Sequence, residues 1–371
     1  MTLRRGEQLH YQHQVGAIEY RLRIQLFLGG SMCRRKFPRF LRGDIRSVWQ
    51  LSLLKFLGFA LTCPLYDLQL YSDVFLTVGA GKYMDQRVKK NRFCLKGGTV
   101  MTFDDQNSII EGGEVWVEGN QIIFVGSTGE FKNEGQAEII DQRGKIICPG
   151  FINAHTHSYS SLLKGTVECD PLDLYMLKVI ATGSAMSSRE IEIAAILDAA
   201  SMLLSGTTGV IDHFSERPNL SANGLKAVRR GFETAGIRAT IATMFADKPY
   251  IDTIPLNRDE LPDEILAQYD AQSSPDIENY FSIMEKTVLE NSEDRLTRVI
   301  LGVDGPQRCT EELLRRTGEF QRRHHCGLHT HMLETKTQAV MAPSTKKGFV
   351  SHLLDLGLLD NFSSLVHFVW A

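Results

Sequence analysis

From about residue 93 onward, apolar and polar residues alternate over short stretches, which is the pattern of half-buried β-strands. This alternation predicts strands over residues 94–103, 114–117, 121–125, 138–141 and 145–147. The tetrapeptide at 118–121, Glu-Gly-Asn-Gln, joins two of these runs and predicts a hairpin turn. Residues 93–148 are therefore predicted to form a small β-sheet module, the N-terminal part of a β-sandwich.

After residue 149, strand-like runs alternate with helix-like runs. Helices are predicted over 188–204, 220–235 and 310–325, the first of them capped by Ser187 or Ser188 and stopped by Gly206. Strands are predicted over 150–157, 209–212, 237–245, 298–303, 327–331 and 365–369. An acidic insertion between 247 and 298 contains one more helical pattern at 277–290. Repeated β-α units favour an α/β fold with a parallel sheet over residues 149–371.

The charge distribution divides the chain near residue 92. Residues 1–92 carry 16 Lys and Arg against 6 Asp and Glu, a balance of +10, whereas the rest has 25 against 38, a balance of −13. In the first segment a basic cluster at 34–46 precedes a mostly apolar stretch at 48–66, which Gln50, Lys55 and Pro64 interrupt. We favour an unassigned, irregular basic extension over a membrane anchor or a mitochondrial address. No nucleic-acid-binding motif accompanies the basic residues, so nucleic acid is not an expected partner.

The number and spacing of the cysteines indicate the cellular compartment. There are seven, an odd number, and none has Cys-x-x-Cys spacing, which argues against a disulfide framework or a cysteine-based zinc site. A reducing cytoplasm is the expected location.

Two His-x-His pairs carry the strongest chemical signal. His155 and His157 end one predicted strand, and His329 and His331 end another. Random placement of 11 histidines in 371 residues gives about 0.3 such pairs. Because side chains two residues apart on a strand project to the same face, each pair can direct two imidazoles at one ion. Neutral imidazoles suit Zn²⁺, so a metal site is predicted at these strand ends.

Four segments together resemble the amidohydrolase superfamily, in the superfamily's order: 149–157 (PGFINAHTH), 205–208 (SGTT), 329–335 (HTHMLET) and 366–370 (VHFVW). The most similar branch holds methylthioadenosine/S-adenosylhomocysteine deaminases, 8-oxoguanine deaminases and triazine chlorohydrolases. The resemblance covers about residues 93–371. It implies a (β/α)8 TIM-type barrel, of which about six strands are present, with the β-module beside it. It also places the acidic insertion as a loop on the active face.

The resemblance implies a role for each of several residues. His155, His157 and His331 would bind one divalent ion, Zn²⁺ or alternatively Fe²⁺. Glu334 would shuttle protons, and His367 would polarise the substrate or orient the nucleophile. Substrate contacts are expected from His213 and Asp304, at the ends of the second and fourth barrel strands.

Three of these residues also have ordinary structural interpretations. Glu334 is typical of a helix N-terminus, His367 of a satisfied core position, and Asp304 of a turn before Gly305. Related deaminases often present a histidine where Asp304 stands in 301–306 (LGVDGP). An anionic acceptor there argues against an adenosine-type substrate.

The expected function is metal-dependent deamination of a small purine- or pyrimidine-like ring. The alternatives are dehalogenation of a triazine-like ring and a noncatalytic binding role. Assembly into a homo-oligomer is compatible with the sequence. In the family the last metal ligand is an aspartate at the end of the eighth barrel strand, and no residue here can be assigned to it. We therefore expect this polypeptide to be inactive alone.

Overall fold

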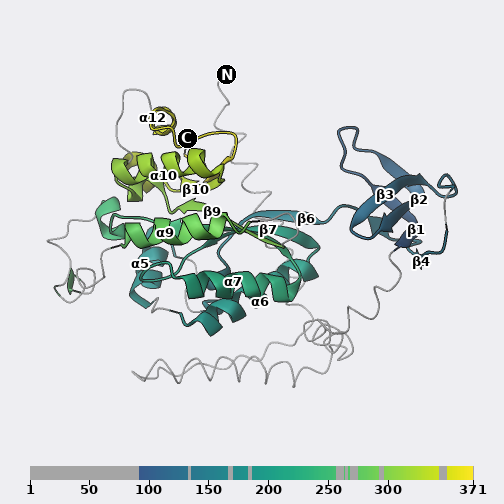
Figure 1. Ribbon diagram of the computed structural model, residues 1–371, viewed down its shortest axis with the longest axis horizontal. Helices are drawn as coiled ribbons and strands as arrows, with labels where there is room; N and C mark the ends of the chain where they lie inside the picture. Colours follow the sequence, from purple (N-terminus) through teal and green to yellow (C-terminus); the bar gives the residue numbers. More distant parts are fainter. Residues whose placement is uncertain are drawn as a thin grey trace, which may run out of the picture. The chain divides into compact units, whose positions relative to one another are not determined.

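Figure 1 shows the computed structural model of the chain. It describes residues 92–132, 135–165, 170–182, 186–255, 263, 266–267, 275–291, 296–341 and 349–370. Apart from Arg92, the predicted basic extension lies outside this part, and so do the membrane and mitochondrial hypotheses about residues 34–66. Within the described part, no helix combines the length and the apolar character that crossing a membrane requires.

The N-terminal described region is a five-stranded sheet. Its strands are β1 (Arg92–Met101), β2 (Ile109–Glu118), β3 (Gln121–Ser127), β4 (Glu138–Asp141) and β5 (Ile146–Ile147). The order is β3-β2-β1-β4, and β5 also pairs with β1. Strands β2 and β3 are antiparallel and close at Glu118 opposite Gln121, so the predicted hairpin is confirmed. Trp116 of β2 is fully buried, and its ring centroid lies 4.8 Å from that of Phe131.

The remaining strands form a single parallel sheet of the barrel type. These are β6 (Phe151–Thr156), β7 (Thr207–Phe214), β8 (Arg238–Phe245), β9 (Thr297–Val303), β10 (Leu328–Met332) and β11 (Ser363–His367). Each strand pairs with the next one in sequence, in the order β11-β10-β9-β8-β7-β6. Six strands of an incomplete (β/α) barrel are therefore present, as the sequence predicts.

Helices lie between the strands along the chain, and several of them lie along the outer side of this sheet (Figure 1). They are α5 (Leu172–Thr182), α6 (Ser188–Leu204), α7 (Ala222–Ala235), α9 (Ile277–Val288), α10 (Glu311–His324), α11 (Lys336–Met341) and α12 (Phe349–Asp355). Short 3₁₀ turns occur at Ser158–Leu162, Tyr250–Thr253 and Pro306–Arg308. Helices α6, α7, α9 and α10 match the predicted patterns, whereas α5, α11 and α12 were not predicted.

Local sequence explains where the predicted helices begin and end. Ser187 and Glu190 form a reciprocal capping box at α6, which satisfies two backbone N–H groups of the first turn. Ser221 and Thr310 cap α7 and α10, and each side-chain hydroxyl accepts one hydrogen bond from a backbone N–H of the first turn. Helix α7 ends at Gly236, whose left-handed φ of 81° costs a glycine little.

The main hydrophobic core lies between the parallel sheet and its helices. It contains fully buried side chains from strands and helices alike, including Phe232, Ile241, Leu301, Leu328 and Met332. Because the six strands are parallel, their carboxyl ends meet at one edge of the sheet. The loops that follow those ends surround the candidate site.

Candidate metal centre

The carboxyl edge of the parallel sheet brings the predicted site residues together. They come from the ends of β6, β7, β10 and β11 and from the turns after β9 and β10: His155, His157, His213, Asp304, His331, Glu334 and His367. A cavity of about 190 Å³ opens among them, and six of the seven line it. The exception is His213, whose side chain is fully buried and does not line the cavity.

His157 and His331 face each other in an arrangement that suits a shared cation. The Nδ1 of His157 lies 2.8 Å from the carbonyl oxygen of His213, and the Nδ1 of His331 bonds the carbonyl oxygen of Asp304. Since a carbonyl only accepts, both Nδ1 atoms carry a hydrogen, and in the neutral rings both Nε2 atoms keep a lone pair. The two Nε2 atoms are 3.2 Å apart.

That separation matches the geometry of a metal site. Two lone pairs at such a distance repel each other unless a proton or a metal ion lies between them. Two nitrogens on a tetrahedral zinc ion, with Zn–N bonds of about 2.0–2.1 Å, lie about 3.4 Å apart. The residues present therefore fit a divalent ion.

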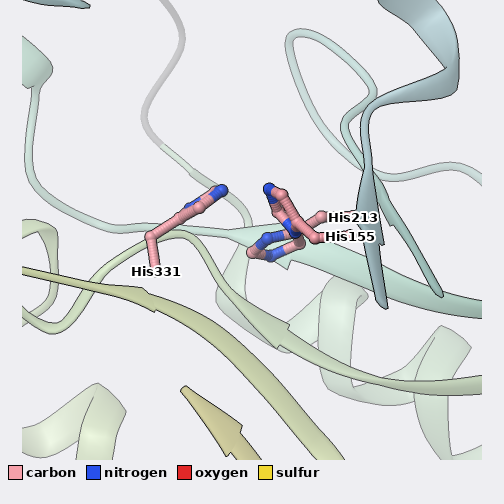
Figure 2. A group of neighbouring side chains, drawn as sticks. All are labelled: His155, His213 and His331. Atoms are coloured by element: carbon pink, nitrogen blue, oxygen red, sulfur yellow. The ribbon is translucent and has the colours of Figure 1, made fainter. Parts of the chain in front are cut away.

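Two further histidines lie beside this facing pair. His155, His213 and His331 have ligand atoms within 4.8 Å of one another. In Figure 2, His331 approaches from one side while His155 and His213 lie together on the other. The Nδ1 of His155 is 2.9 Å from the Nε2 of His329, and the Nε2 of His155 is buried without a hydrogen-bond partner. His155 can thus present Nε2 to an ion while His329 supports its other nitrogen.

Burial keeps most of these rings neutral, as metal ligands must be. It lowers the pKa of His157 to about 4, helped by the neighbouring His331, and the pKa of His155 to about 2, helped by His157. His331 is the exception. Burial lowers its pKa as well, but hydrogen bonding to Asp304 outweighs burial and the pKa ends above its usual value. His331 is therefore the ring in this cluster that most favours a positive charge.

Glu334 lies at the mouth of the cavity, three residues after His331. Its Oε1 is 3.5 Å from the Nε2 of His367, and its side chain is 25 % exposed. Burial raises the pKa of the carboxyl above the usual 4.5, although His331 opposes this. Leu333 adopts a left-handed φ of 46°, and the Glu334 backbone N–H donates to the Gln338 side-chain oxygen at 2.7 Å. The backbone is thus held where the carboxylate faces the cavity with a pKa nearer neutrality.

Asp304 is paired inside the cavity wall. It forms an ion pair with Arg308, and its Oδ1 lies 3.7 Å from the Nδ1 of His331. Burial alone would raise the pKa of Asp304, but Arg308 and His331 outweigh burial and hold the pKa well below its ordinary value. The carboxylate is therefore ionised and acts on His331 through its charge as well as through its backbone carbonyl.

A sequence profile of the amidohydrolase family matches residues 146–369, which is more than half of the chain. The chain belongs to the amidohydrolase family. It is 26 % identical over 275 residues to a 5-methylthioadenosine/S-adenosylhomocysteine deaminase of Desulforamulus reducens, covering 72 % of this chain and 55 % of that protein. It is 28 % identical over 265 residues to a 5'-deoxyadenosine deaminase of Methanothermobacter thermautotrophicus, covering 70 % and 54 %. The chain thus spans about half the length of these curated relatives.

Solved amidohydrolase-type structures share the fold. An atrazine chlorohydrolase of Arthrobacter aurescens TC1 complexed with zinc superposes with a TM-score of 0.59 at 22 % identity, over 74 % of this chain and 60 % of that one. A guanine deaminase of C. acetobutylicum with bound guanine gives a TM-score of 0.58 at 20 % identity, over 74 % and 62 %. At this identity the likeness supports the incomplete barrel and nothing finer.

The amidohydrolase site also contains residues that sequence reasoning did not select. His329 belonged to a noticed motif, but nothing in the motif distinguishes it from His331. Arg308 lies four residues after Asp304, a spacing that could have indicated their pairing. Tyr175 and Tyr250 line the cavity from α5 and from the turn after β8, and no sequence signal separates them from other loop aromatics.

Proposed function

We propose that this amidohydrolase site binds one divalent ion and hydrolytically removes an exocyclic amine from a purine-like ring. The observation that carries the proposal is the 3.2 Å approach of the His157 and His331 Nε2 atoms, both of which keep a lone pair. His155, His157 and His331 would hold Zn²⁺, with Fe²⁺ as the alternative. A bound divalent ion supplies acidity that lets water react near neutral pH.

Glu334 is the proton carrier in this proposal. The Glu334 carboxylate lines the cavity, and burial raises its pKa toward the working pH. A group whose pKa is near the working pH is more effective both as a general base and as a general acid. Glu334 takes a proton from the attacking water and passes it to a ring nitrogen. It then takes the second proton from the newly attached hydroxyl group and delivers it to the amine, which leaves as ammonia. The Nε2 of His367 lies 3.5 Å from the Oε1 of Glu334 at the same edge, and His367 would polarise the substrate or orient the attacking water.

The cavity wall supports a flat heterocyclic substrate. Leu172, Tyr175 and Met176 from α5 lie on the lining together with Met244 and Tyr250, and these apolar and aromatic side chains suit a ring face. Asp304 is held by Arg308, so the pair offers both an acceptor and N–H donors to a polar ring edge. The sequence relatives named as adenine-nucleoside deaminases favour a purine-like ring, whereas Asp304 argues for different ring contacts.

A cytoplasmic location forms part of the proposal. Cysteines 94, 148, 309 and 326 are all thiols, which suits a reducing compartment.

The decisive experiment measures the ammonium or chloride that the zinc-loaded protein releases from candidate substrates. Methylthioadenosine, S-adenosylhomocysteine, 5'-deoxyadenosine and guanine are assayed for ammonium, and atrazine for chloride, beside Glu334→Gln. Ammonium release by the wild type and not by the variant supports deamination. Chloride release alone selects the dehalogenase alternative. Zinc binding without release of either ion supports the noncatalytic alternative or the expected inactivity of this polypeptide alone, and no zinc binding at all overturns the proposal.

A further inference from the structure

Two acidic residues that the proposed mechanism does not use lie close to the metal centre. Asp212 is on β7, one residue before His213, and Asp198 is on α6. Neither of them lines the cavity. Side chains alternate between the two faces of a strand, so Asp212 points away from the face of β7 that carries His213. Any role of the two acids in the site is therefore indirect.

Asp212 is completely buried, and its carboxyl group is bonded to Ser158. The backbone N–H of Ser158 donates to Oδ1 at 2.9 Å, and the Ser158 hydroxyl donates to Oδ2 at 2.6 Å. Among the described residues, no lysine, arginine or histidine forms an ion pair with this group, and burial raises the pKa of Asp212 to about 7. A buried acid without a cationic partner costs stability. What the position gains in return is a double bond to one residue of the turn after β6.

Asp198 holds the same segment through two hydroxyl groups. Its Oδ2 accepts from the Thr156 hydroxyl and its Oδ1 from the Ser161 hydroxyl, each at 3.1 Å. Thr156 comes immediately before His157, and Ser158 comes immediately after it. The two acids therefore bond the residues on both sides of this one histidine.

The strand that holds the backbone next to His157 also holds its ring. The Nδ1 of His157 lies 2.8 Å from the carbonyl oxygen of His213, which directly follows Asp212. This bond fixes the tautomer that leaves the Nε2 lone pair for an ion. It requires that residue 157 stay in one place relative to the end of β7, and the bonds between Asp212 and Ser158 set that place.

We propose that Asp212 and Asp198 are positioning residues that hold His157 in its metal-binding orientation. This inference rests on the proposed metal site. The Asp212 carboxyl can act in either charge state, because a neutral acid still accepts the backbone N–H on one oxygen and donates from the other to the hydroxyl. Its role is to fix the turn rather than to transfer a proton. An asparagine, which has the same shape and can also accept and donate, should replace it.

The first measurement needs no metal. The full chain is labelled with nitrogen-15 histidine, and the ring N–H signal of His157 is identified by its absence from His157→Gln. Asp212→Ala should speed the solvent exchange of this N–H about tenfold, since weakening one hydrogen bond changes an equilibrium by about this factor. Asp212→Asn should exchange nearly as slowly as the wild type. Unchanged exchange in Asp212→Ala overturns the assignment.

The second measurement compares zinc affinities by chelator competition. Asp212→Ala should weaken zinc binding about 10- to 100-fold, the usual cost of losing a group that supports a ligand, and Asp212→Asn should recover most of this loss. Glu192→Gln is the matched control. Glu192 is also a buried acid of the α6 layer, 8 % exposed, but it is bonded to Arg230 and Arg189 rather than to the segment at 156–161.

The control should lower stability and leave the zinc affinity at the wild-type value. Equal losses of affinity in Asp212→Ala and Glu192→Gln overturn the assignment, and so does an Asp212→Asn protein that binds zinc as weakly as Asp212→Ala.

If Asp212→Ala does not fold, Ser158→Ala decides, because it removes the hydroxyl bond and keeps the backbone N–H. It should weaken zinc binding roughly three- to tenfold, as the loss of one hydrogen bond does. Unchanged zinc affinity and unchanged His157 exchange in this variant overturn the assignment. A wild-type protein that binds no zinc overturns the proposed function instead, and the metal-free exchange measurement still decides the role of Asp212.

Discussion

The two His-x-His pairs are alike in sequence, but the structure uses them differently. We call His155 and His157 the β6 pair, and His329 and His331 the β10 pair. Both members of the β6 pair line the cavity, whereas only His331 of the β10 pair does. His329 is fully buried and supports His155 from behind. The same spacing therefore produces two cavity-lining rings on one strand, and one cavity-lining ring with a buried supporting ring on the other.

The places of the two strands in the sheet explain this difference. Strand β6 is at one end of the strand order, and its residues are at most half-buried. Strand β10 lies between β9 and β11, and all five of its residues are buried. The strands are not neighbours, yet His155 contacts His329 and His157 contacts His331. The curvature of the sheet brings the pairs together and lets one ring of the interior strand support a ring of the end strand.

The largest expected effect concerns the residue that follows the β10 pair. Glu334→Gln should lower kcat/KM by about 10²- to 10⁴-fold, the usual contribution of a general acid or base. Because burial raises the pKa of Glu334, wild-type activity should fall as pH drops through that raised pKa. The variant should lose this acidic limb. The check is kcat/KM against pH for both proteins.

Ser160 provides the matched control for Glu334. It lies three residues after His157, as Glu334 lies three residues after His331, and its hydroxyl donates to the His157 carbonyl at 2.7 Å. Ser160→Ala should change kcat/KM by less than about tenfold, because one neutral hydrogen bond is lost. Equal losses in the two variants would contradict a proton-transfer role specific to Glu334.

Within the β10 pair, substitution of each histidine should separate a ligand from its support. His331→Ala should weaken zinc binding more than about 100-fold, whereas His329→Ala should weaken it about 10- to 100-fold, as loss of an outer partner does. Chelator competition measures both affinities. If the two variants bind zinc equally well, the distinction drawn from burial is wrong.

A third prediction concerns how the free energy of unfolding of the metal-free protein depends on pH. Burial lowers the pKa of His157 and of His329 to about 4, whereas the unfolded chain titrates near 6.5. The unfolded state therefore binds more protons between these values, and the free energy of unfolding should fall as pH decreases through that window. The slope is at most about 1.4 kcal/mol per pH unit for each histidine.

Urea unfolding of the metal-free protein at several pH values measures this slope. His329→Gln should flatten it, because one of the titrating rings is removed. His325→Asn, which removes an exposed histidine at the end of α10, should leave it unchanged. A slope of opposite sign in the wild type would contradict the lowered pKa values.

The smallest effect concerns a carboxylate that joins the loops after the two strands. Asp173 of α5, which follows β6, accepts from Tyr250 Oη at 2.9 Å and from Thr337 of α11, which follows β10, at 3.0 Å. Asp173→Ala should lower the free energy of unfolding by about 1–3 kcal/mol and raise KM more than it lowers kcat, since cavity residues lie on both loops.

Tyr250→Phe removes only one of these two hydrogen bonds and is the partial control. Its effect on the free energy of unfolding should be about 1 kcal/mol. Denaturant unfolding and steady-state kinetics test both variants. An Asp173→Ala protein with unchanged KM would show that the bridge does not shape the cavity.

Local sequence predicted much of the fold because its signals act over a few residues. The hairpin at 118–121 and the cap at Ser187 depend only on nearby backbone and side-chain chemistry. The strand ends were displaced by a few residues at β2 and β11, where pairing with neighbouring strands sets the limits. Helices α5, α11 and α12 were not predicted. Helices α11 and α12 are short, with six and seven residues, and α5 belongs to a connection whose packing partners are distant in sequence.

The sequence by itself determined which residues could bind a metal: two His-x-His pairs, each with both rings on one face of a strand, and a glutamate three residues after the second. It could not assign tautomers, because the carbonyls that fix them belong to His213 and Asp304, far along the chain. Nor could it separate His329 from His331 or show that His213 is buried without a partner. Those distinctions depend on which strands meet across the curved sheet, and only the tertiary structure decides that.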